Sequence, residues 1–362
     1  MKFSELPLQS TFDGSLRFPV LYNGANKSVK LDRLVNYLKD NVLTLGEDEQ
    51  DEVNGLMASK TLTQAEYNAM VNHNPKAWYI IVDDLDATKV WAVYRGDSLV
   101  SYEPNMVGEF CDDSTEEDWY WWPNNVKTAI PVDPATLKFS YYWPGKINSS
   151  AHLFSGGLDA TDKFTREVKL KRLERIPPVG WETYYLFSRL TRCEQLPVID
   201  FRYSNGASYF GFICIQNQAQ NLFTRLAFRN TERITNGGML INLHSQTKLK
   251  CVTGLDFTSC KYTNDSFLSI YGPAYVDIRN LGRPADATSF NLVDKNFGDD
   301  SIMEGARQSL VDTLLTNSYN RAAAGYSTVT ITLSPQALAR LTASERSQIT
   351  ARGYTLTSLA FN

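Results

Sequence analysis

Three apolar triplets recur at a near-regular spacing in the second half of this sequence. They are Ile199-Asp200-Phe201, Leu226-Ala227-Phe228 and Leu255-Asp256-Phe257, with a looser fourth member at Val276-Asp277-Ile278. Their last residues are separated by 228−201 = 27, 257−228 = 29 and 278−257 = 21 positions. Such a period is typical of solenoids, in which each unit contributes one short strand and buries its apolar face only by stacking on its neighbours.

A second apolar cluster follows each triplet. These clusters are Phe210 with Phe212, Met239 with Leu240 and Ile241, Phe267 with Leu268 and Ile270, and Phe290 with Leu292 and Val293. The drifting spacing indicates a degenerate repeat, and the function of a stack of this kind lies on a surface.

The last sixty residues predict an α/β cap that closes the stack. We expect a helix over 303–319, with Ala306, Leu310 and Leu314 on one stripe, and a strand over 329–333. Ser334-Pro335 is a helix start, and Thr342 with Glu345 forms a capping box whose helix ends at Gly353. A final strand follows over 354–357.

The first hundred residues predict two small modules. The first has a strand over 17–22, a turn at Asn23-Gly24 and a helix with Leu31, Leu34, Val35 and Leu38 on one face. An acidic run over 47–52 marks a boundary. The second module has a helix over 63–71 and two β-rich stretches over 77–82 and 90–94.

Aromatic residues cluster beside carboxylates between 105 and 145. Acidic residues over 109–118 lead into Trp119, Tyr120, Trp121 and Trp122. Aromatic rings beside carboxylates are suited to sugar binding, so these four residues are the candidate binding residues. The alternative is that the rings cover the first turn of the stack, since neighbouring strand residues point to opposite faces. A glycosidase needs only two suitably spaced carboxylates, but nothing in the sequence singles out a pair.

The charge balance argues against nucleic acid as a partner. The chain has 36 basic and 40 acidic residues, a formal charge of −4, and no global field to attract polyphosphate. No run of eighteen apolar residues occurs, and the start lacks the apolar core of a signal peptide. We therefore expect a protein made in the cytoplasm and not inserted into a membrane.

The sequence shows no catalytic or metal-binding constellation. Its three histidines, His73, His152 and His244, lie more than 70 residues apart, and no short ligand pair suggests zinc. Its five cysteines form no C-x-x-C pair and are expected to be reduced and buried. We therefore predict a non-enzymatic protein without cofactors. A cysteine nucleophile, Cys193 or Cys214, would need a distant histidine brought to it across the fold.

The N-terminal segments resemble modules of tailed-phage virion proteins, especially of phages that infect gut Bacteroidetes. The first resemblance is carried by Ser4 to Pro7, Asp13-Gly14, Phe18 to Val20, Asn23-Gly24 and Lys30-Leu31, and the second by 62–70, 77–81 and 90–97. The resemblance of these segments to virion proteins implies that the N-terminal region docks to other virion proteins. The candidate docking residues are Leu6, Pro7, Phe18, Pro19, Leu31 and Leu34.

The rest of the chain resembles degenerate BspA-like leucine-rich-repeat proteins, with 307–319 and 333–356 resembling the cap of such repeats. The Asn or Cys usual in a leucine-rich turn is not kept from repeat to repeat. The expected fold is mixed α+β. It has an N-terminal virion-docking module at 1–60, a small helix-hairpin module at 61–105, an aromatic and acidic connecting region at 106–145, a degenerate leucine-rich-repeat-like solenoid at 146–300 and an α/β cap at 301–362.

The resemblance implies a virion structural protein, a tail or head fibre or adaptor, that displays its repeats for host attachment to a surface glycan or protein. It also implies a homo-oligomer, with a trimer expected. The alternatives are a bacterial leucine-rich-repeat adhesin, and a carbohydrate-binding protein or glycosidase that uses Trp119 to Trp122.

Overall fold

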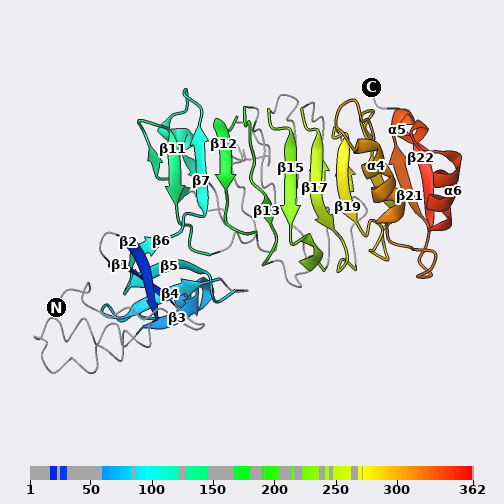
Figure 1. Cartoon of the computed structure of the whole chain (residues 1–362). Coiled ribbons are helices and arrows are strands. Elements are labelled where there is room, and N and C mark those ends of the chain that lie inside the picture. The colour runs from blue at the N-terminus through cyan, green and yellow to red at the C-terminus, as the bar shows by residue number, and fades with distance from the viewer. Residues whose placement is uncertain are drawn as a thin grey trace, which may run out of the picture. The chain divides into compact units, whose positions relative to one another are not determined.

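The computed structural model of the 362-residue chain describes residues 17–22, 25–30, 59–83, 86–121, 128–145, 167–179, 190, 192–203, 213–215, 222–235, 241–243, 248–261, 268–270 and 272–360. The chain separates into two compact units, Met1–Pro104 and Asn105–Asn362. Figure 1 shows several sheets and few helices. The mixed α/β character expected from the sequence is confirmed.

The first unit contains a hairpin and a four-stranded sheet. The hairpin pairs β1 (Arg17–Tyr22) with β2 (Ala25–Lys30). The sheet has the order β3-β4-β5-β6, with β3 (Lys60–Thr63) parallel to β4 (Trp78–Val82), and β5 (Val90–Arg95) and β6 (Ser98–Tyr102) antiparallel. Helix α3 (Gln64–Asn68) begins with a capping box between Thr63 and Glu66, because two otherwise unpaired amides are satisfied reciprocally there.

Aromatic side chains surround a histidine beside this sheet. His73 stacks on Tyr67 with ring centroids 4.0 Å apart and meets the edge of Tyr79 at 5.4 Å. Its Nδ1 lies 2.5 Å from an Asp97 carboxylate oxygen, and its Nε2 lies 3.0 Å from the Tyr67 carbonyl oxygen. Both ring nitrogens therefore face acceptors, an arrangement that only the doubly protonated imidazolium satisfies in full.

The second unit begins with an antiparallel sheet of the order β10-β11-β7-β12. Its strands are β7 (Met106–Phe110), β10 (Val132–Asp133), β11 (Lys138–Tyr141) and β12 (Leu170–Arg175). The far edge of β12 bonds to the following coil, where the Leu173 amide donates to the Gln195 carbonyl at 2.9 Å and the Glu194 amide to the Lys171 carbonyl at 2.8 Å. Strand β12 thus joins the antiparallel sheet to a stack of parallel strands.

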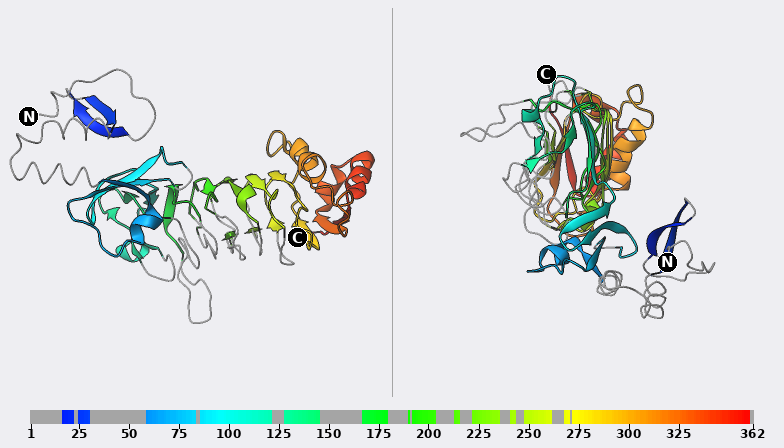
Figure 2. Two further views of the ribbon diagram at one scale, coloured as in Figure 1. Left: turned by 90° about the horizontal axis from the view of Figure 1, so that it is seen from below. Right: turned by 90° about the vertical axis from the view of Figure 1, so that its left-hand side faces the viewer.

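Two parallel sheets form this stack, and the strands from β13 to β20 alternate between them, whereas β21 and β22 both extend the second sheet. The first sheet contains β13 (Ile199–Asp200), β15 (Arg225–Arg229), β17 (Cys251–Asp256) and β19 (Tyr275–Arg279). The second sheet contains β14 (Ile213–Ile215), β16 (Ile241–Leu243), β18 (Leu268–Ile270), β20 (Ser289–Leu292), β21 (Val329–Leu333) and β22 (Tyr354–Ser358). Figure 2 shows the coils following one another in chain order.

The apolar triplets lie on the first sheet, and the described parts of the trailing clusters lie on the second. Equivalent positions of successive triplets do not pair with each other in the first sheet. Ile199, the first residue of its triplet, pairs with Phe228, the last residue of the next, and Leu255 pairs with Ile278 in the same way. A register shift between Val252 and Leu255 accompanies this offset. Gly254 lies within the shift at φ 81°, and a Cβ there would come within 2.0 Å of the Phe228 carbonyl oxygen. Only glycine fits this close approach.

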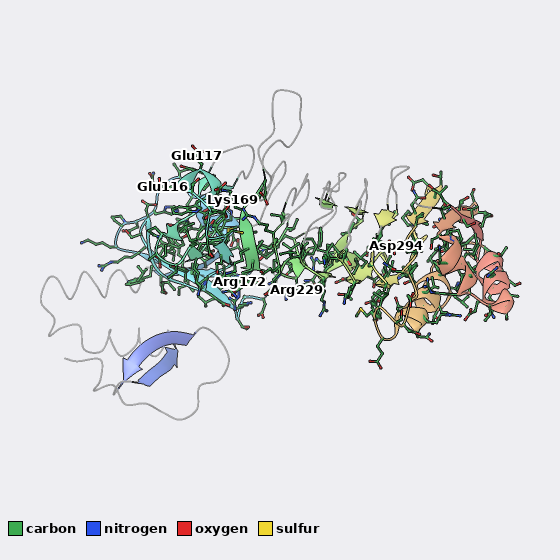
Figure 3. All side chains as sticks on the ribbon, turned by 90° about the horizontal axis from the view of Figure 1, so that it is seen from above. Glu116, Glu117, Lys169, Arg172, Arg229 and Asp294 are labelled. Atoms are coloured by element: carbon green, nitrogen blue, oxygen red, sulfur yellow. The ribbon has the colours of Figure 1, made fainter. Side chains whose placement is uncertain are left out.

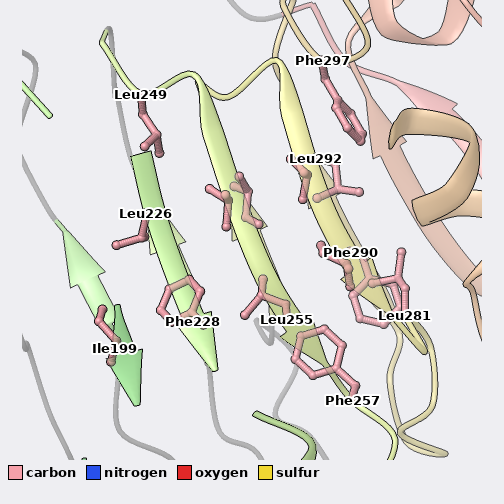
Figure 4. Close-up of a cluster of buried hydrophobic side chains, with 14 of the residues drawn as sticks. Ile199, Leu226, Phe228, Leu249, Leu255, Phe257, Leu281, Phe290, Leu292 and Phe297 are labelled. Atoms are coloured by element: carbon pink, nitrogen blue, oxygen red, sulfur yellow. The ribbon is translucent and has the colours of Figure 1, made fainter. Parts of the chain in front are cut away.

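A single apolar core runs through the second unit. Strand residues that point between the two sheets are buried, and Figure 4 shows those of successive coils side by side. The connecting region expected at 106–145 contributes Met106, Phe110, Ile130 and Phe139 to this core. The C-terminal segments contribute Leu310, Leu314, Ile331 and Ile349 to it. Burial of each of these side chains stabilises the fold by roughly 1.5–3 kcal/mol before entropy is counted.

The first sheet ends at a helix. Helix α4 (Ala306–Val311) continues as a π-helical turn, η6 (Asp312–Thr316), and both contact β19. The Ser309 and Thr313 hydroxyls both donate to the Val276 carbonyl, at 2.7 and 2.8 Å. An exposed strand edge can pair with another chain, and here side chains of a helix bond to that edge instead.

The second sheet continues through the predicted cap. Helix α5 (Pro335–Ala339) begins at Ser334 with Pro335 in its first turn, and α6 (Ala343–Ala351) begins with the Thr342–Glu345 capping box. Both helix starts and the strand at Val329–Leu333 are confirmed. Arg321, which belongs to the cap segment, is fully buried. Its guanidinium donates to the carbonyls of Gly282, Pro284, Ala285 and Ser327.

Candidate functional site

The aromatic and acidic segment lies beside the antiparallel sheet of the second unit, and Figure 3 shows Glu116, Glu117 and Lys169 in one region there. The 3₁₀ turn η3 (Glu116–Asp118) precedes Trp119 and is capped by Thr115, whose amide donates to Asp118 at 2.9 Å. Trp119 is half-buried, packs against the core and donates from Nε1 to the Ser114 hydroxyl at 3.3 Å. Its ring therefore helps to hold the fold.

The next rings lie on a short ribbon. Strand β8 (Tyr120–Trp121) pairs with β9 (Thr128–Ala129), and the Tyr120 side chain is half-buried. Only the backbone of Trp121 is described, and Trp122 lies outside the described residues. The binding role of Trp119 to Trp122 stays a prediction.

The candidate docking residues lie largely outside the described part of the chain. Phe18 and Pro19 belong to β1 and pair with Val29 and Ser28 of β2. Leu6, Pro7, Leu31 and Leu34 are outside the described residues. Docking through them stays a prediction.

Basic side chains hold the carboxylates near Trp119. Arg192 binds Asp113 through two nitrogens, at 2.9 and 3.2 Å, and binds Glu167 at 3.1 Å. The Arg192 bond lowers the pKa of Asp113. Lys169 lies 3.6 Å from Asp113 and 3.9 Å from Asp118. The lowered pKa of Asp113 favours its charged form and is opposite in direction to the raised pKa that a glycosidase acid needs.

A second ion-pair group links β7 to β12. Glu109 is nearly buried and contacts Lys171 at 2.8 Å and Arg172 at 2.5 Å. The Lys171 bond is the largest cause that lowers the pKa of Glu109, and the same bond raises the pKa of Lys171. This group joins two strands of the antiparallel sheet and has the geometry of a structural ion pair.

The described cysteines have the properties of core residues. Cys111, Cys193, Cys251 and Cys260 are buried thiols. Burial raises the pKa of Cys193 to about 12 and also raises the pKa of Cys111 and Cys251. The thiolate is the nucleophilic form, so Cys193 is poorly suited to attack at neutral pH. Cys214 has only its backbone described, and His152 and His244 lie outside the described residues.

A ladder of Asp and Asn side chains follows the ends of the first-sheet strands. Asn230 donates to Asp200 of the preceding coil at 2.6 Å, and Asn280 donates to Asp256 of its preceding coil at 2.9 Å. Asn230 and Asn280 both have left-handed backbones, at φ 58° and 56°, which Asn tolerates better than most residues. The ladder fixes the turn of one coil against the next.

Asp200 is the most buried member of this ladder. It is 3% exposed and accepts bonds from Arg202 at 2.5 Å and from Arg229 at 2.7 Å. Burial alone would raise the pKa of Asp200, but the bonds from Arg202 and Asn230 outweigh it and the pKa is lowered. Sequence reasoning missed the ladder. The signal was the repeated Arg-Asn step after an apolar residue, at Phe228-Arg229-Asn230 and Ile278-Arg279-Asn280.

Within the residues that the structure describes, no group of His, Cys, Asp and Glu side chains is arranged to hold a metal ion. Among these same residues, none of the helices is both long and apolar enough to cross a bilayer. No protein-family model, curated protein or solved structure matches this chain.

Proposed function

We propose that this protein is a non-enzymatic structural component of a tailed-phage virion, a fibre or adaptor that displays a leucine-rich-repeat-like stack. The observation that carries the proposal is the coil-by-coil pairing of two parallel sheets over one core. Each coil contacts its neighbours, and such a stack offers an extended surface in place of an enclosed site.

The side chains that chemistry would require have structural partners. Asp118 and Asp113 near Trp119 form ion pairs with Lys169 and Arg192, and Trp119 packs against the core. The Cys193 thiol is fully buried. These contacts favour a structural role for the segment over a glycosidase centred on Trp119 to Trp122.

The virion assignment comes from the resemblance of the N-terminal modules and of the C-terminal cap. In this proposal the N-terminal region docks to other virion proteins, and the stack meets a host-surface glycan or protein as part of a homo-oligomer. A surface display role fits strands such as β20 and β21, whose residues turned toward the core are apolar and whose residues turned away are polar.

The test is the protein content of purified particles of the phage that encodes the chain. Mass spectrometry of gradient-purified virions should detect its peptides at a constant ratio to the major capsid protein. Antibodies against the second unit should then label one place on the particle in electron micrographs. Virions that lack the protein, purified beside lysates that contain it, would contradict the proposal.

A further inference from the structure

Six positions on the outward face of the second sheet carry only neutral polar side chains. Two rows cross strands β20, β21 and β22 in register. Ser289 faces Thr330, which faces Thr355, and Asn291 faces Thr332, which faces Thr357. We call these six residues the neutral face.

The neutral face is accessible to solvent. Thr355 and Thr357 are exposed, and the other four side chains are partly exposed. The residues between them, Phe290 and Ile331, are fully buried, and Leu356 packs against the core. This alternation turns every second residue outward on all three strands.

The first sheet shows that this architecture does not require a neutral face. Its outward positions include Arg225, Arg229 and Arg279, all exposed, and the partly exposed Asp277. Charged side chains also protect a sheet edge against unwanted pairing, yet the outward residues of β22, the last strand of the second sheet, are threonines. Because the same stack carries charges on one sheet and none at these six positions of the other, we read the neutral face as a recognition surface.

The rows are regular and stiff. Neighbouring strands lie about 4.8 Å apart, and alternate residues on one strand about 6.7 Å apart. Threonine has a restricted side-chain torsion, and the Thr332 and Thr357 hydroxyls lie 3.2 Å from each other. The backbone register continues the second row to Ser269 on β18 and Asn242 on β16. The bond between the Thr332 and Thr357 hydroxyls orders both groups before a ligand arrives, which lowers the entropy lost on binding.

We propose that the neutral face binds an uncharged, extended polysaccharide that lies across the coils. Hydroxyl and amide groups both donate and accept hydrogen bonds, as sugar hydroxyls require, and the threonine methyl groups offer apolar contact to the CH groups of the sugar rings. An anionic ligand would find no cation among the six residues. The inference rests on the proposed display role and names the class of molecule that the stack meets.

The test is retention of the purified full-length chain on insoluble polysaccharides. Cellulose, chitin and mannan are the neutral probes, and cross-linked polygalacturonate is the anionic comparison. We expect retention on at least one neutral polysaccharide, weaker retention on polygalacturonate, and an affinity that changes little between low and high salt, since ion pairs would be screened. Retention on none of the neutral probes would overturn the inference.

A double variant, Thr332→Val with Thr357→Val, removes two hydroxyls and keeps the branched side chains that strands favour. It should weaken retention about tenfold or more. Thr253→Val makes the same change at a partly exposed position of β17 on the first sheet and should bind as the unmodified chain does. If the double variant binds as tightly as Thr253→Val, the neutral face is not the site.

A third variant, Thr355→Glu, places a charge on the neutral face and tests whether binding requires an uncharged surface. Thermal melting of all variants reports whether the stack is still folded. A folded Thr355→Glu chain that retains full binding would also overturn the inference. Because these assays use the isolated chain, their failure leaves the virion assignment untouched, which particle mass spectrometry decides separately.

Discussion

The Ser309 hydroxyl accepts a hydrogen bond from the Val276 amide at 2.9 Å and donates one to the Val276 carbonyl at 2.7 Å. One side chain thus satisfies both backbone groups of a residue on the last strand of the first sheet. A neighbouring strand would otherwise bond to these groups. A helix thus ends the sheet at Val276 without leaving the amide and the carbonyl of this buried residue unpaired.

Replacement of Ser309 by alanine should destabilise the second unit. The Val276 amide would lose its bond in a buried place, which costs about 1–3 kcal/mol. Chemical denaturation monitored by circular dichroism measures the change. Ser347→Ala is the matched control, since Ser347 is exposed on α6 and its hydroxyl donates to the Ala343 carbonyl of the same helix. Equal losses of stability in the two variants would show that the bonds to Val276 stabilise the fold no more than the exposed bond of Ser347 does.

Replacement of Gly254 by alanine should be more damaging than the same change at another left-handed glycine. The new methyl group would meet the Phe228 carbonyl oxygen at 2.0 Å, while at Gly325, with φ 71°, nothing lies within 4 Å. Gly325→Ala should cost about 1 kcal/mol for its backbone alone. Gly254→Ala should cost at least about 2 kcal/mol more, because backbone atoms must move. Similar midpoints of urea unfolding for the two variants would argue against the close approach of these coils.

His73 should make the first unit less stable as the pH rises. The bond to the Tyr67 carbonyl, followed by the bond to Asp97, raises the pKa of His73 above its ordinary value of 6.5. A raised pKa means that this stabilisation is complete below about pH 6.5 and is lost as the pH rises through the folded-state value. A proton NMR titration should show His73 ionising above pH 6.5.

The control for this titration is Asp97→Asn, which keeps the shape of the partner and removes its charge. The pKa of His73 should fall in this variant but stay raised by the Tyr67 carbonyl. His73→Gln should abolish the part of the pH dependence of melting that lies above pH 6.5. A His73 that ionises at or below its ordinary pKa would contradict the bonded arrangement.

Arg321→Met should be the most destabilising of these substitutions. Arg321 is 0% exposed and donates to four carbonyl oxygens from two loops. Methionine fills similar volume but cannot donate, so all four bonds are lost, two of them from the buried residues Gly282 and Pro284, and we expect a loss above about 3 kcal/mol. Arg283→Met is the comparison, because Arg283 is half-exposed and its guanidinium lies over Tyr319 at 5.1 Å. That cation–π contact is worth about 1 kcal/mol or less.

The C-terminal cap was the most predictable part of this fold. Ser334, Pro335, Thr342 and Glu345 are capping residues whose local chemistry fixes where helices begin. The helix expected over 303–319 is present only from Ala306 and changes to a π-helical turn at Asp312. That change accompanies the contact with β19, and the hydrophobic stripe of a sequence does not encode it.

The coil register was not predictable from the triplets. Spacing indicated which residues form strands, but pairing depends on the turns, and Ile199 faces Phe228 rather than Leu226. Gly254 lies within the register shift of β17, and its left-handed backbone passes close to Phe228 of the preceding coil. The aromatic segment was ambiguous for a related reason, since burial of Trp119 depends on residues such as Ser114 and Ile130 that meet it only in the fold.

The first sheet stops at β19, whereas the second sheet runs on to β22. The structure that terminates each sheet is therefore encoded after the repeated coils and is separate from them. Duplication of one coil in the gene would insert a strand into each sheet and leave Ser309, Arg321 and the capping helices with their present neighbours. Length is thus a trait that can evolve in this chain without redesign of either end.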